Sequence, residues 1–243
     1  HGDSDLSFAP HWSPSGGPSY HDSDGSHAMT GAEVEELLEA HVAAAVRAKA
    51  AGFQGVEVWG AYHSLVDQFW TPWSNQRTDQ WGGGLEGRTR FSRELIEHVR
   101  RACGEEFIVG LAVSYSTAYE VTLGAEALCE ILDLHDRTGH VDYVTVGAGS
   151  YLEFEAIIPP FTHAEKLTTP LTQQLKGVLK HAVVTSEAGV RTPENGEAII
   201  ASGLADLVSI VRGQIADPHL ARKVKEGRAE DVRGCISCNQ MCW

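Results

Sequence analysis

Side chains that commonly do chemistry or recognise ligands are concentrated between Gly52 and Phe91. After a buried-strand pattern this stretch breaks into a long loop that contains Tyr62, His63, Asp67, Asn75, Arg77, Asp79 and Arg88. Long loops inside compact domains are uncommon and usually functional. The alternative is a surface insertion, but a solvated loop does not normally carry the aromatic side chains found here, which are Tyr62, Phe69, Trp70, Trp73 and Trp81. We therefore predict a functional loop.

Three thiols late in the chain form a second candidate site. Cys235, Cys238 and Cys242 have the spacing C-x2-C-x3-C, which favours a shared metal centre. An iron–sulfur cluster needs four thiolates and structural zinc also needs four ligands, so a fourth ligand is expected elsewhere. The alternative is one disulfide and one free thiol. Cys103 and Cys129 fall on expected helix faces and are interpreted as core residues.

Two further loops, Ser186 to Arg191 and Arg212-Gly213, carry an anion-binding pattern. Gly189 allows a close approach of the backbone, and backbone N–H groups at a helix start attract anions. Arg212 offers a bidentate fork to a phosphate. The alternative is that Arg191 and Arg212 are surface charges, because one glycine with one arginine is a weak signal.

The bulk properties exclude several classes of function. The 243 residues carry a formal net charge of −14, so neither a nucleic acid nor an anionic membrane is expected as a partner. No apolar run has the length of a membrane span, and no signal peptide is visible, although the chain starts at His1 rather than Met. Five cysteines, an odd number with three clustered at one end of the chain, do not resemble a secreted disulfide framework, so we expect a reducing, cytoplasmic location.

Helices alternate with apolar strands after residue 29, whereas residues 1–29 have no period and are expected to form a loop. Thr30 and Glu33 make a T-x-x-E capping box, which starts a helix that Gly52 closes. The expected strands are 56–59, 107–113, 141–146, 182–185 and 207–211. The other expected helices are 88–102, Thr122 to 134, 171–179, Thr192-Pro193 to Gly203, and Asp217-Pro218 to Gly227.

This repeat of strand and helix indicates βα units and a parallel sheet. Two architectures compete, an open doubly wound sheet and a (β/α)8 barrel. No G-x-G-x-x-G follows a strand, which removes the usual dinucleotide-binding form of the first. For a barrel, about three strands would have to precede His1.

Two long strings resemble the old yellow enzyme superfamily. GFQGVEVWGAYHSLVDQFWTPWSNQRTDQWGGGLEGRTRF, and ASGLADLVSIVRGQIADPHLARKVKEGR followed by CISCNQMC, are similar to its iron–sulfur flavoprotein branch, and the resemblance covers residues 30–243. That branch includes dienoyl-CoA reductase, trimethylamine dehydrogenase and N-demethylases. The resemblance implies an α/β fold in which residues 1–230 are an incomplete (β/α)8 TIM barrel, about the last five βα units, that binds FMN. It also implies that residues 231–243 start a 4Fe–4S cluster segment, after which a region absent here would handle NAD(P)H or FAD.

Residue by residue, the resemblance implies three sites. The FMN phosphate contacts would be Ala188, Gly189, Val211 and Arg212, the cluster ligands Cys235, Cys238 and Cys242, and the substrate-facing groups Trp59, Tyr62 and His63.

The chain departs from the family pattern at several of these positions. Ala112 stands where the family commonly has an arginine beside the flavin, and this loss is expected to shift the redox balance or abolish activity. Trp59, which can only donate a hydrogen bond, replaces the usual His or Tyr. Tyr62 replaces the usual His, and Gly84 and Gly87 replace Ser and Asn.

Two functions follow. The first is an FMN-dependent oxidoreductase that moves a hydride between flavin and a small organic substrate, relays electrons through the cluster to a partner, and forms a homo-oligomer. Its substrate is either an N-methylated amine, held by cation–π contacts from Trp59, Tyr62 and Trp70, or an enoyl compound protonated by Tyr62. The second is a non-catalytic barrel remnant with a structural zinc or iron–sulfur site, which Ala112 favours.

Overall fold

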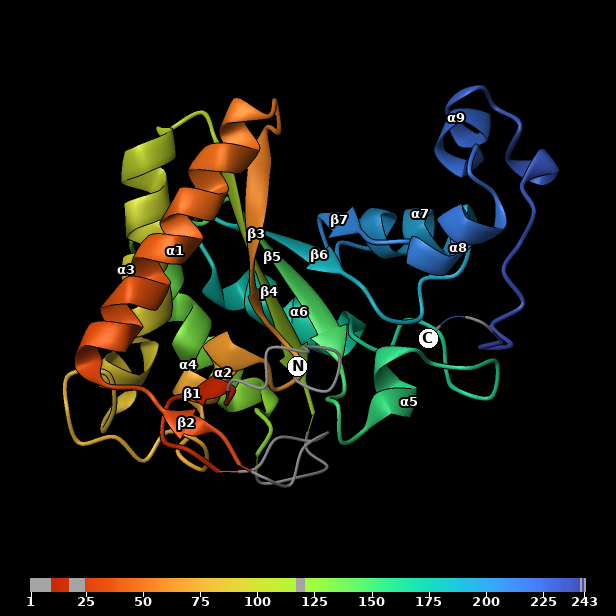
Figure 1. Cartoon of the computed structure of the whole chain (residues 1–243). Coiled ribbons are helices and arrows are strands. Elements are labelled where there is room, and N and C mark those ends of the chain that lie inside the picture. The colour runs from red at the N-terminus through yellow and green to blue at the C-terminus, as the bar shows by residue number, and fades with distance from the viewer. Residues whose placement is uncertain (1–9, 18–24, 117–120, 241, 243) are drawn as a thin grey trace.

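A single parallel sheet organises the chain. The computed structural model describes residues 10–17, 25–116, 121–240 and 242. The sheet order is β3-β4-β5-β6-β7, with the bounds β3 Gly55–Gly60, β4 Ile108–Tyr115, β5 Tyr143–Ala148, β6 Val183–Ser186 and β7 Leu207–Val208 (Figure 1). Each strand pairs in parallel with the next one in sequence, which confirms the predicted βα repeat.

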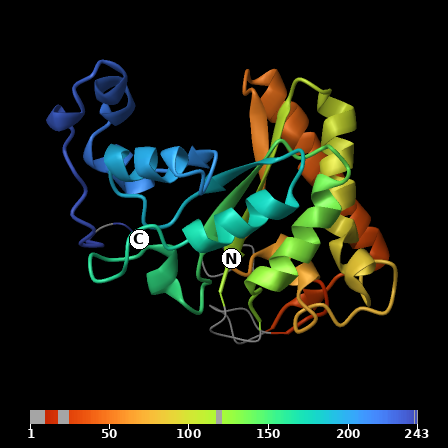
Figure 2. The same cartoon turned by 180° about the vertical axis from the view of Figure 1, so that it is seen from behind.

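Helices separate the strands and cover one side of the sheet. The longer ones are α1 Gly31–Ala50, α3 Leu85–Cys103, α4 Ala125–Asp136, α6 Thr169–Val178 and α7 Pro193–Ala201. In Figure 1 α4 and α6 lie behind the strands, and in Figure 2, the view from behind, they lie in front of them; α1 packs against α3 at the side of the sheet. No helix within the described ranges combines the length and the apolar character needed to cross a membrane.

Short elements complete the fold. They are β1 Trp12–Ser13, β2 His27–Ala28, α2 Leu65–Trp70, α5 Phe154–Ile157, α8 Val211–Ala216, α9 Leu220–Lys225 and the 3-10 helix Ala229–Asp231. The loop predicted for residues 1–29 is thus interrupted by the paired β1 and β2, and its parts 1–9 and 18–24 lie outside the described residues.

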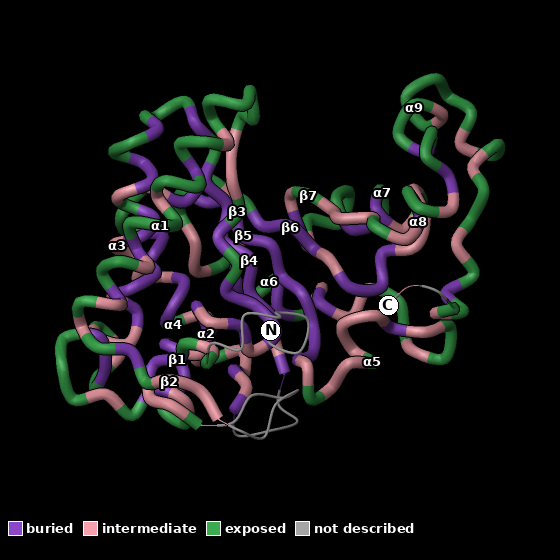
Figure 3. The backbone as a smooth tube through the Cα atoms, viewed as in Figure 1, coloured by how far each residue is buried: buried purple, intermediate pink, exposed green. Residues whose placement is uncertain are grey.

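Alternation along the strands separates two faces of the sheet. Val58, Leu111 and Val146 face the helices and belong to the main hydrophobic core, and Figure 3 shows the strands as the buried centre of the molecule. The opposite face, called the inner face below, carries Glu57, Trp59, Gly110, Ala112, Ser114, Tyr143, Thr145, Gly147, Val183 and Thr185, as the strand register shows. It is the face that the interior of a closed barrel would enclose.

Three boundaries differ from those predicted. The Thr122 hydroxyl donates to the Ser116 carbonyl at 3.0 Å, so it closes a loop, and Gly124 is the N-cap of α4. Helix α3 begins before Arg88, at Leu85. Strand β7 ends at Val208 and Val211 begins α8, because the pairing with β6 extends only from residue 207 to residue 208.

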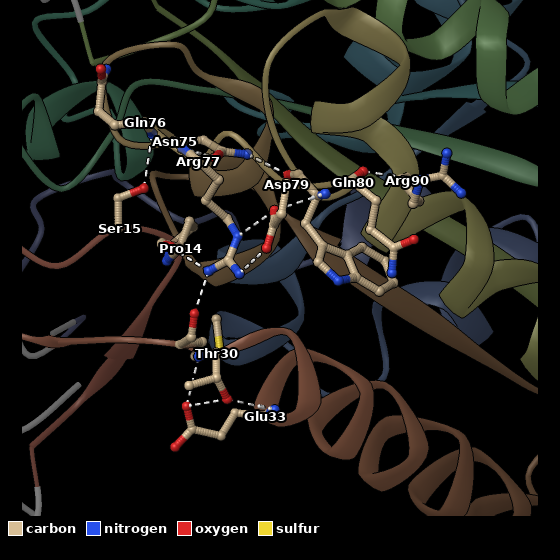
Figure 4. Close-up of polar contacts among 12 residues, drawn as sticks. Pro14, Ser15, Thr30, Glu33, Asn75, Gln76, Arg77, Asp79, Gln80 and Arg90 are labelled. Atoms are coloured by element: carbon tan, nitrogen blue, oxygen red, sulfur yellow. Dashed lines mark hydrogen bonds and ion pairs between the residues drawn. The ribbon is translucent and has the colours of Figure 1, made fainter.

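The loop after β3 is held in place by its own polar side chains (Figure 4). The Arg77 guanidinium donates to the Pro14 carbonyl at 2.8 Å and to the Met29 carbonyl, and it pairs with Asp79. Asn75 donates to the carbonyls of Phe69 and Trp81, each at 2.8 Å. Asn75, Arg77 and Asp79 therefore hold the loop and the N-terminal segment together.

Candidate functional site

A pocket beyond the ends of β6 and β7 gathers the four residues predicted to contact a phosphate. Ala188, Gly189, Val211 and Arg212 all line it, and Cys235 lies on its wall. The pocket is shallow and partly open to solvent. Residues far apart in the sequence therefore converge as predicted.

The Gly189 backbone forms one wall of this pocket. Its φ is +84°, and a Cβ atom at this position would lie 2.9 Å from the Lys166 nitrogen, so a side chain is excluded both by conformation and by space. Ala188 also has a positive φ, of 27°. The loop thus presents bare backbone to a ligand, as phosphate sites commonly do.

Both arginines of the pocket already donate hydrogen bonds within the protein. Arg212 donates to the Asn239 side-chain oxygen at 2.6 Å and to the Pro159 carbonyl at 2.9 Å, so two donors expected to bind phosphate are engaged within the protein. Arg191 donates to the carbonyls of Pro160 and His163 at 3.0 and 2.9 Å; its Nε and the Ser237 hydroxyl are buried without a partner. Both residues line the pocket.

The three late cysteines lie near this pocket but do not gather. Cys235, Cys238 and Cys242 are all free thiols, and no group of three or more His, Cys, Asp or Glu residues in the described part of the chain is placed to hold a metal. Thiol chemistry suits iron or zinc, and such sites commonly form only when the metal binds. The segment is fixed to the pocket through Asn239.

The predicted substrate-facing residues lie together at the end of β3. The rings of Trp59 and Tyr62 have centroids 5.4 Å apart; Trp59 is 44% exposed and Tyr62 only 5%. Tyr62 and His63 both have φ of +63°, which is unusual for residues other than glycine. The Tyr62 N–H donates to the Ser114 hydroxyl at 2.6 Å, and the His63 N–H donates to the Asp67 carboxylate at 2.7 Å.

The Tyr62 phenol points across the inner face. A Cβ atom on Gly147 would overlap its hydroxyl, so the hydroxyl stands directly over β5. Burial raises the pKa of Tyr62 well above its usual range, and the carboxylates of Glu187 and Glu57 raise it further. Tyr62 therefore stays protonated at neutral pH and can donate a hydrogen bond. Burial also lowers the pKa of His63, which keeps that ring neutral.

Two residues join this face to the pocket. Ile157 lines the pocket and also packs against the small cluster of Ala61, Tyr62 and Ala112. Glu187 lines the pocket and acts electrostatically on Tyr62. These two residues link the pocket to the part of the inner face that carries Tyr62.

The prediction that Trp70 forms part of the amine-binding wall is wrong. Trp70 is fully buried and donates to the Ser92 hydroxyl at 2.9 Å. It packs against Gly60, on the helix side of the sheet, so it cannot face a ligand on the inner face. Tyr143 takes its place there, since its ring lies over Gly110.

Sequence reasoning missed the polar residues of the strands themselves. Glu57 accepts a hydrogen bond from the Thr145 hydroxyl at 2.7 Å, and Glu187 is half-buried with a pKa raised by burial and by Glu57. The available signal is the two-residue repeat of side chains along a strand. It places Glu57 on the same face as Trp59, and Glu187 on the same face as Thr185.

Comparisons with known proteins identify relatives of this arrangement. The NADH:flavin oxidoreductase / NADH oxidase family model matches residues 13–231. The chain is 38% identical over 210 residues to an NADH oxidase of Thermoanaerobacter brockii, covering 86% of this chain and 32% of the relative. It is 30% identical over 210 residues to an N,N-dimethylglycine/sarcosine dehydrogenase of Chromohalobacter salexigens, covering 85% and 30%.

A solved structure extends the comparison to the fold. A 2-naphthoyl-CoA reductase in complex with 2-naphthoyl-CoA superposes with a TM-score of 0.88 at 30% identity, over 96% of this chain and 35% of that one. The predicted incomplete (β/α)8 barrel is thereby confirmed. The chain spans about a third of the length of each of these relatives.

Proposed function

Because the chain belongs to the NADH:flavin oxidoreductase / NADH oxidase family, we propose that it is the FMN-holding part of an oxidoreductase. Its substrate is a small organic molecule, either an N-methylated amine that is oxidised or an enoyl or enone compound that is reduced. The membership confirms the resemblance to the old yellow enzyme superfamily. FMN, when bound, supplies the hydride chemistry, and the protein supplies position and electrostatics.

One observation carries this proposal. The pocket with the predicted phosphate contacts and the face with Trp59 and Tyr62 share Ile157 and Glu187 as neighbours. A cofactor whose phosphate lies against Gly189 therefore has its substrate-facing residues next to it. The bare backbone at Gly189 supports the phosphate end.

The residues of the chain divide the remaining tasks. Tyr62, whose hydroxyl lies on the inner face over Gly147, is the proton donor for an enoyl substrate, which needs a proton at the carbon that receives no hydride. Trp59 offers an exposed aromatic face for a methylated ammonium group. His63 lies next to Tyr62 and stays neutral at physiological pH.

We also propose that Cys235, Cys238 and Cys242 supply three thiolates to an iron–sulfur centre that relays electrons. The support is their C-x2-C-x3-C spacing and the place of Cys235 on the pocket wall. The competing function is a non-catalytic remnant with structural zinc or iron–sulfur. It is favoured by Ala112, which provides no cation on the inner face. A visible spectrum separates the two, because flavin absorbs and a zinc protein is colourless.

The experiment follows the flavin of the full-length protein under anaerobic conditions with two panels of compounds, one that can reduce it and one that can reoxidise it. N-methyl amines test oxidation directly, and enoyl-CoA esters are tested by reoxidation of the chemically reduced flavin. We expect one panel to change the flavin absorbance at 450 nm, a wavelength at which oxidised flavin absorbs. A protein that retains flavin but responds to neither panel contradicts both substrate assignments.

A further inference from the structure

The Asn239 side chain joins the phosphate pocket to the segment that carries the late cysteines, residues 235–240, called the cysteine segment below. Both ends of its amide have partners. Asn239 Oδ1 accepts a hydrogen bond from Arg212 Nη1 at 2.6 Å, and Asn239 Nδ2 donates to the Ile158 carbonyl at 2.5 Å. A flipped amide would place a donor against Arg212 and an acceptor against the carbonyl, so this orientation alone satisfies both partners.

Two further hydrogen bonds reinforce this arrangement. The Phe161 N–H donates to the Ser237 carbonyl at 3.0 Å, so the cysteine segment also holds the loop that follows α5. Arg212 Nη2 donates to the Pro159 carbonyl of the same loop at 2.9 Å. The guanidinium therefore lies between that loop and the cysteine segment, and neither of its two partners belongs to a strand of the sheet.

The partners of Arg212 are neutral, which leaves its positive charge available to a ligand. An amide and a carbonyl orient the guanidinium, and no carboxylate of the described residues, Glu187 of the same pocket included, forms an ion pair with it. Arg191, by contrast, pairs with Glu165 at 3.7 Å. A guanidinium has more N–H donors than the two that Arg212 uses here, so it can be held in place and still donate to a phosphate.

The backbone at Asn239 offers an alternative reason for this residue type. Its φ is +57°, in the left-handed region that favours asparagine and glycine. An asparagine needed only for this turn could be replaced by glycine without loss, whereas one needed for its amide could not. The two amide contacts favour the second reason, because the turn itself requires no partner for either end of the side chain.

We propose that Asn239 is a positioning residue, which orients Arg212 toward an anionic ligand in the pocket without neutralising its charge. The inference rests on the proposed function, from which it takes the phosphate of FMN as that ligand. Asn239 is not part of the pocket wall and acts only through Arg212. An amide of the cysteine segment thus sets how well the pocket distinguishes a phosphorylated flavin from one without phosphate.

Titration of the flavin-free full-length protein with FMN and with riboflavin, followed by flavin fluorescence, tests the proposal. Asn239→Gly keeps the turn and removes the amide. It should weaken FMN binding about fivefold and leave riboflavin binding unchanged, because only the phosphate reaches Arg212. Asn239→Asp also suits the turn and keeps an acceptor for Arg212. Its carboxylate neutralises the guanidinium, however, so it should weaken FMN binding at least about tenfold.

Gln240→Gly is the matched control, since it removes an exposed amide from the neighbouring position and should leave both affinities unchanged. A double-mutant cycle with Arg212→Ala tests whether the effect passes through the guanidinium. Without Arg212, Asn239→Gly should change the FMN affinity no further. Circular dichroism checks that each variant folds.

Three outcomes overturn the inference and leave the proposed function standing. They are a preference for FMN that survives Asn239→Gly, an equal loss of FMN and riboflavin binding in that variant, and an effect of Asn239→Gly that persists without Arg212. A wild-type protein that binds the two flavins equally, or binds neither, contradicts the FMN site of the proposed function and overturns the inference with it.

Discussion

At the scale of single residues, a strained turn sets the geometry of the substrate-facing groups. Tyr62 and His63 are consecutive left-handed residues, and each such residue costs about 1 to 3 kcal/mol unless its surroundings hold it. The Ser114 hydroxyl and the Asp67 carboxylate accept the two N–H groups of the turn, and the Gln68 amide donates to the His63 carbonyl at 3.0 Å. Asp67 is buried, and its second oxygen has no partner.

The Asp67→Asn variant is expected to change how stability depends on pH. Burial raises the pKa of Asp67 to about 7, above its value near 3.9 in the unfolded chain. The folded state therefore binds the proton more tightly, and the stability from this group is lost as pH rises from about 4 to about 7. The free energy of unfolding of the variant minus that of the wild type should increase over this window, by up to about 4 kcal/mol.

Urea unfolding between pH 4 and pH 8 measures this difference. His135 has a pKa lowered by burial to about 4, so its contribution is lost as pH falls from about 6.5 to about 4 and opposes that of Asp67. Both proteins contain His135, and the subtraction removes its effect. A difference that stays constant with pH would rule out a proton held by Asp67 in the folded state.

The turn also marks the limit of what could be predicted at this scale. Trp59, Tyr62 and His63 were singled out by resemblance, and their clustering follows from adjacency in sequence. The prediction that Trp70 faces a ligand is wrong because no helix is predicted inside the loop. Without that helix, nothing in the sequence indicates that the Trp70 side chain points to the helix side of the sheet. Glu57 and Glu187 lie on different strands, and only the sheet register brings them near each other.

At the scale of elements, helices with strong local sequence signals are predicted correctly, whereas short helices are not. The capping box at Thr30 is present as predicted, with both reciprocal hydrogen bonds. Helix α2, by contrast, spans only six residues, and so short a helix is stable only through tertiary packing. Its buried Phe69 and Trp70 provide that packing, which no local pattern indicates. The same reason explains why the sequence predicts a strand as far as Val211, where α8 begins.

Thr30→Ala should destabilise the protein by about 1 kcal/mol, because α1 loses the side-chain acceptor for the Glu33 N–H. Thr30→Ser keeps the hydroxyl and is expected to stay within about 0.5 kcal/mol of the wild type. Chemical unfolding at one pH measures both. Equal losses in the two variants would mean that the hydroxyl does not stabilise the helix.

At the scale of the whole molecule, the sheet leaves apolar side chains uncovered. Trp59, Ile108, Val183 and Leu207 are each 41 to 46% exposed, and alternation places Val183 and Leu207 with Trp59 on the inner face. Exposed apolar patches commonly mark contact surfaces. The homo-oligomer expected from the sequence remains a proposal, and the interior of a closed barrel would cover this face.

Because this face is uncovered in the 243-residue chain taken alone, we expect that chain to self-associate through it and the double variant Val183→Lys, Leu207→Lys to be a monomer, because buried ammonium groups would oppose the contact. Ile215→Lys is the control, since Ile215 is 70% exposed but lies on α8, away from the inner face. Sedimentation velocity over a range of concentrations gives the answer. A wild-type monomer, or association unaffected by the two lysines, would refute the expectation.

The most direct test of the whole account is a fluorescence titration of the chain with FMN and with riboflavin, which differ only in the phosphate. If the pocket at Gly189 and Arg212 receives that phosphate, FMN should bind at least about tenfold more tightly, a difference of about 1.4 kcal/mol. Equal affinities for the two flavins, or no binding of either, would contradict the assignment of this pocket.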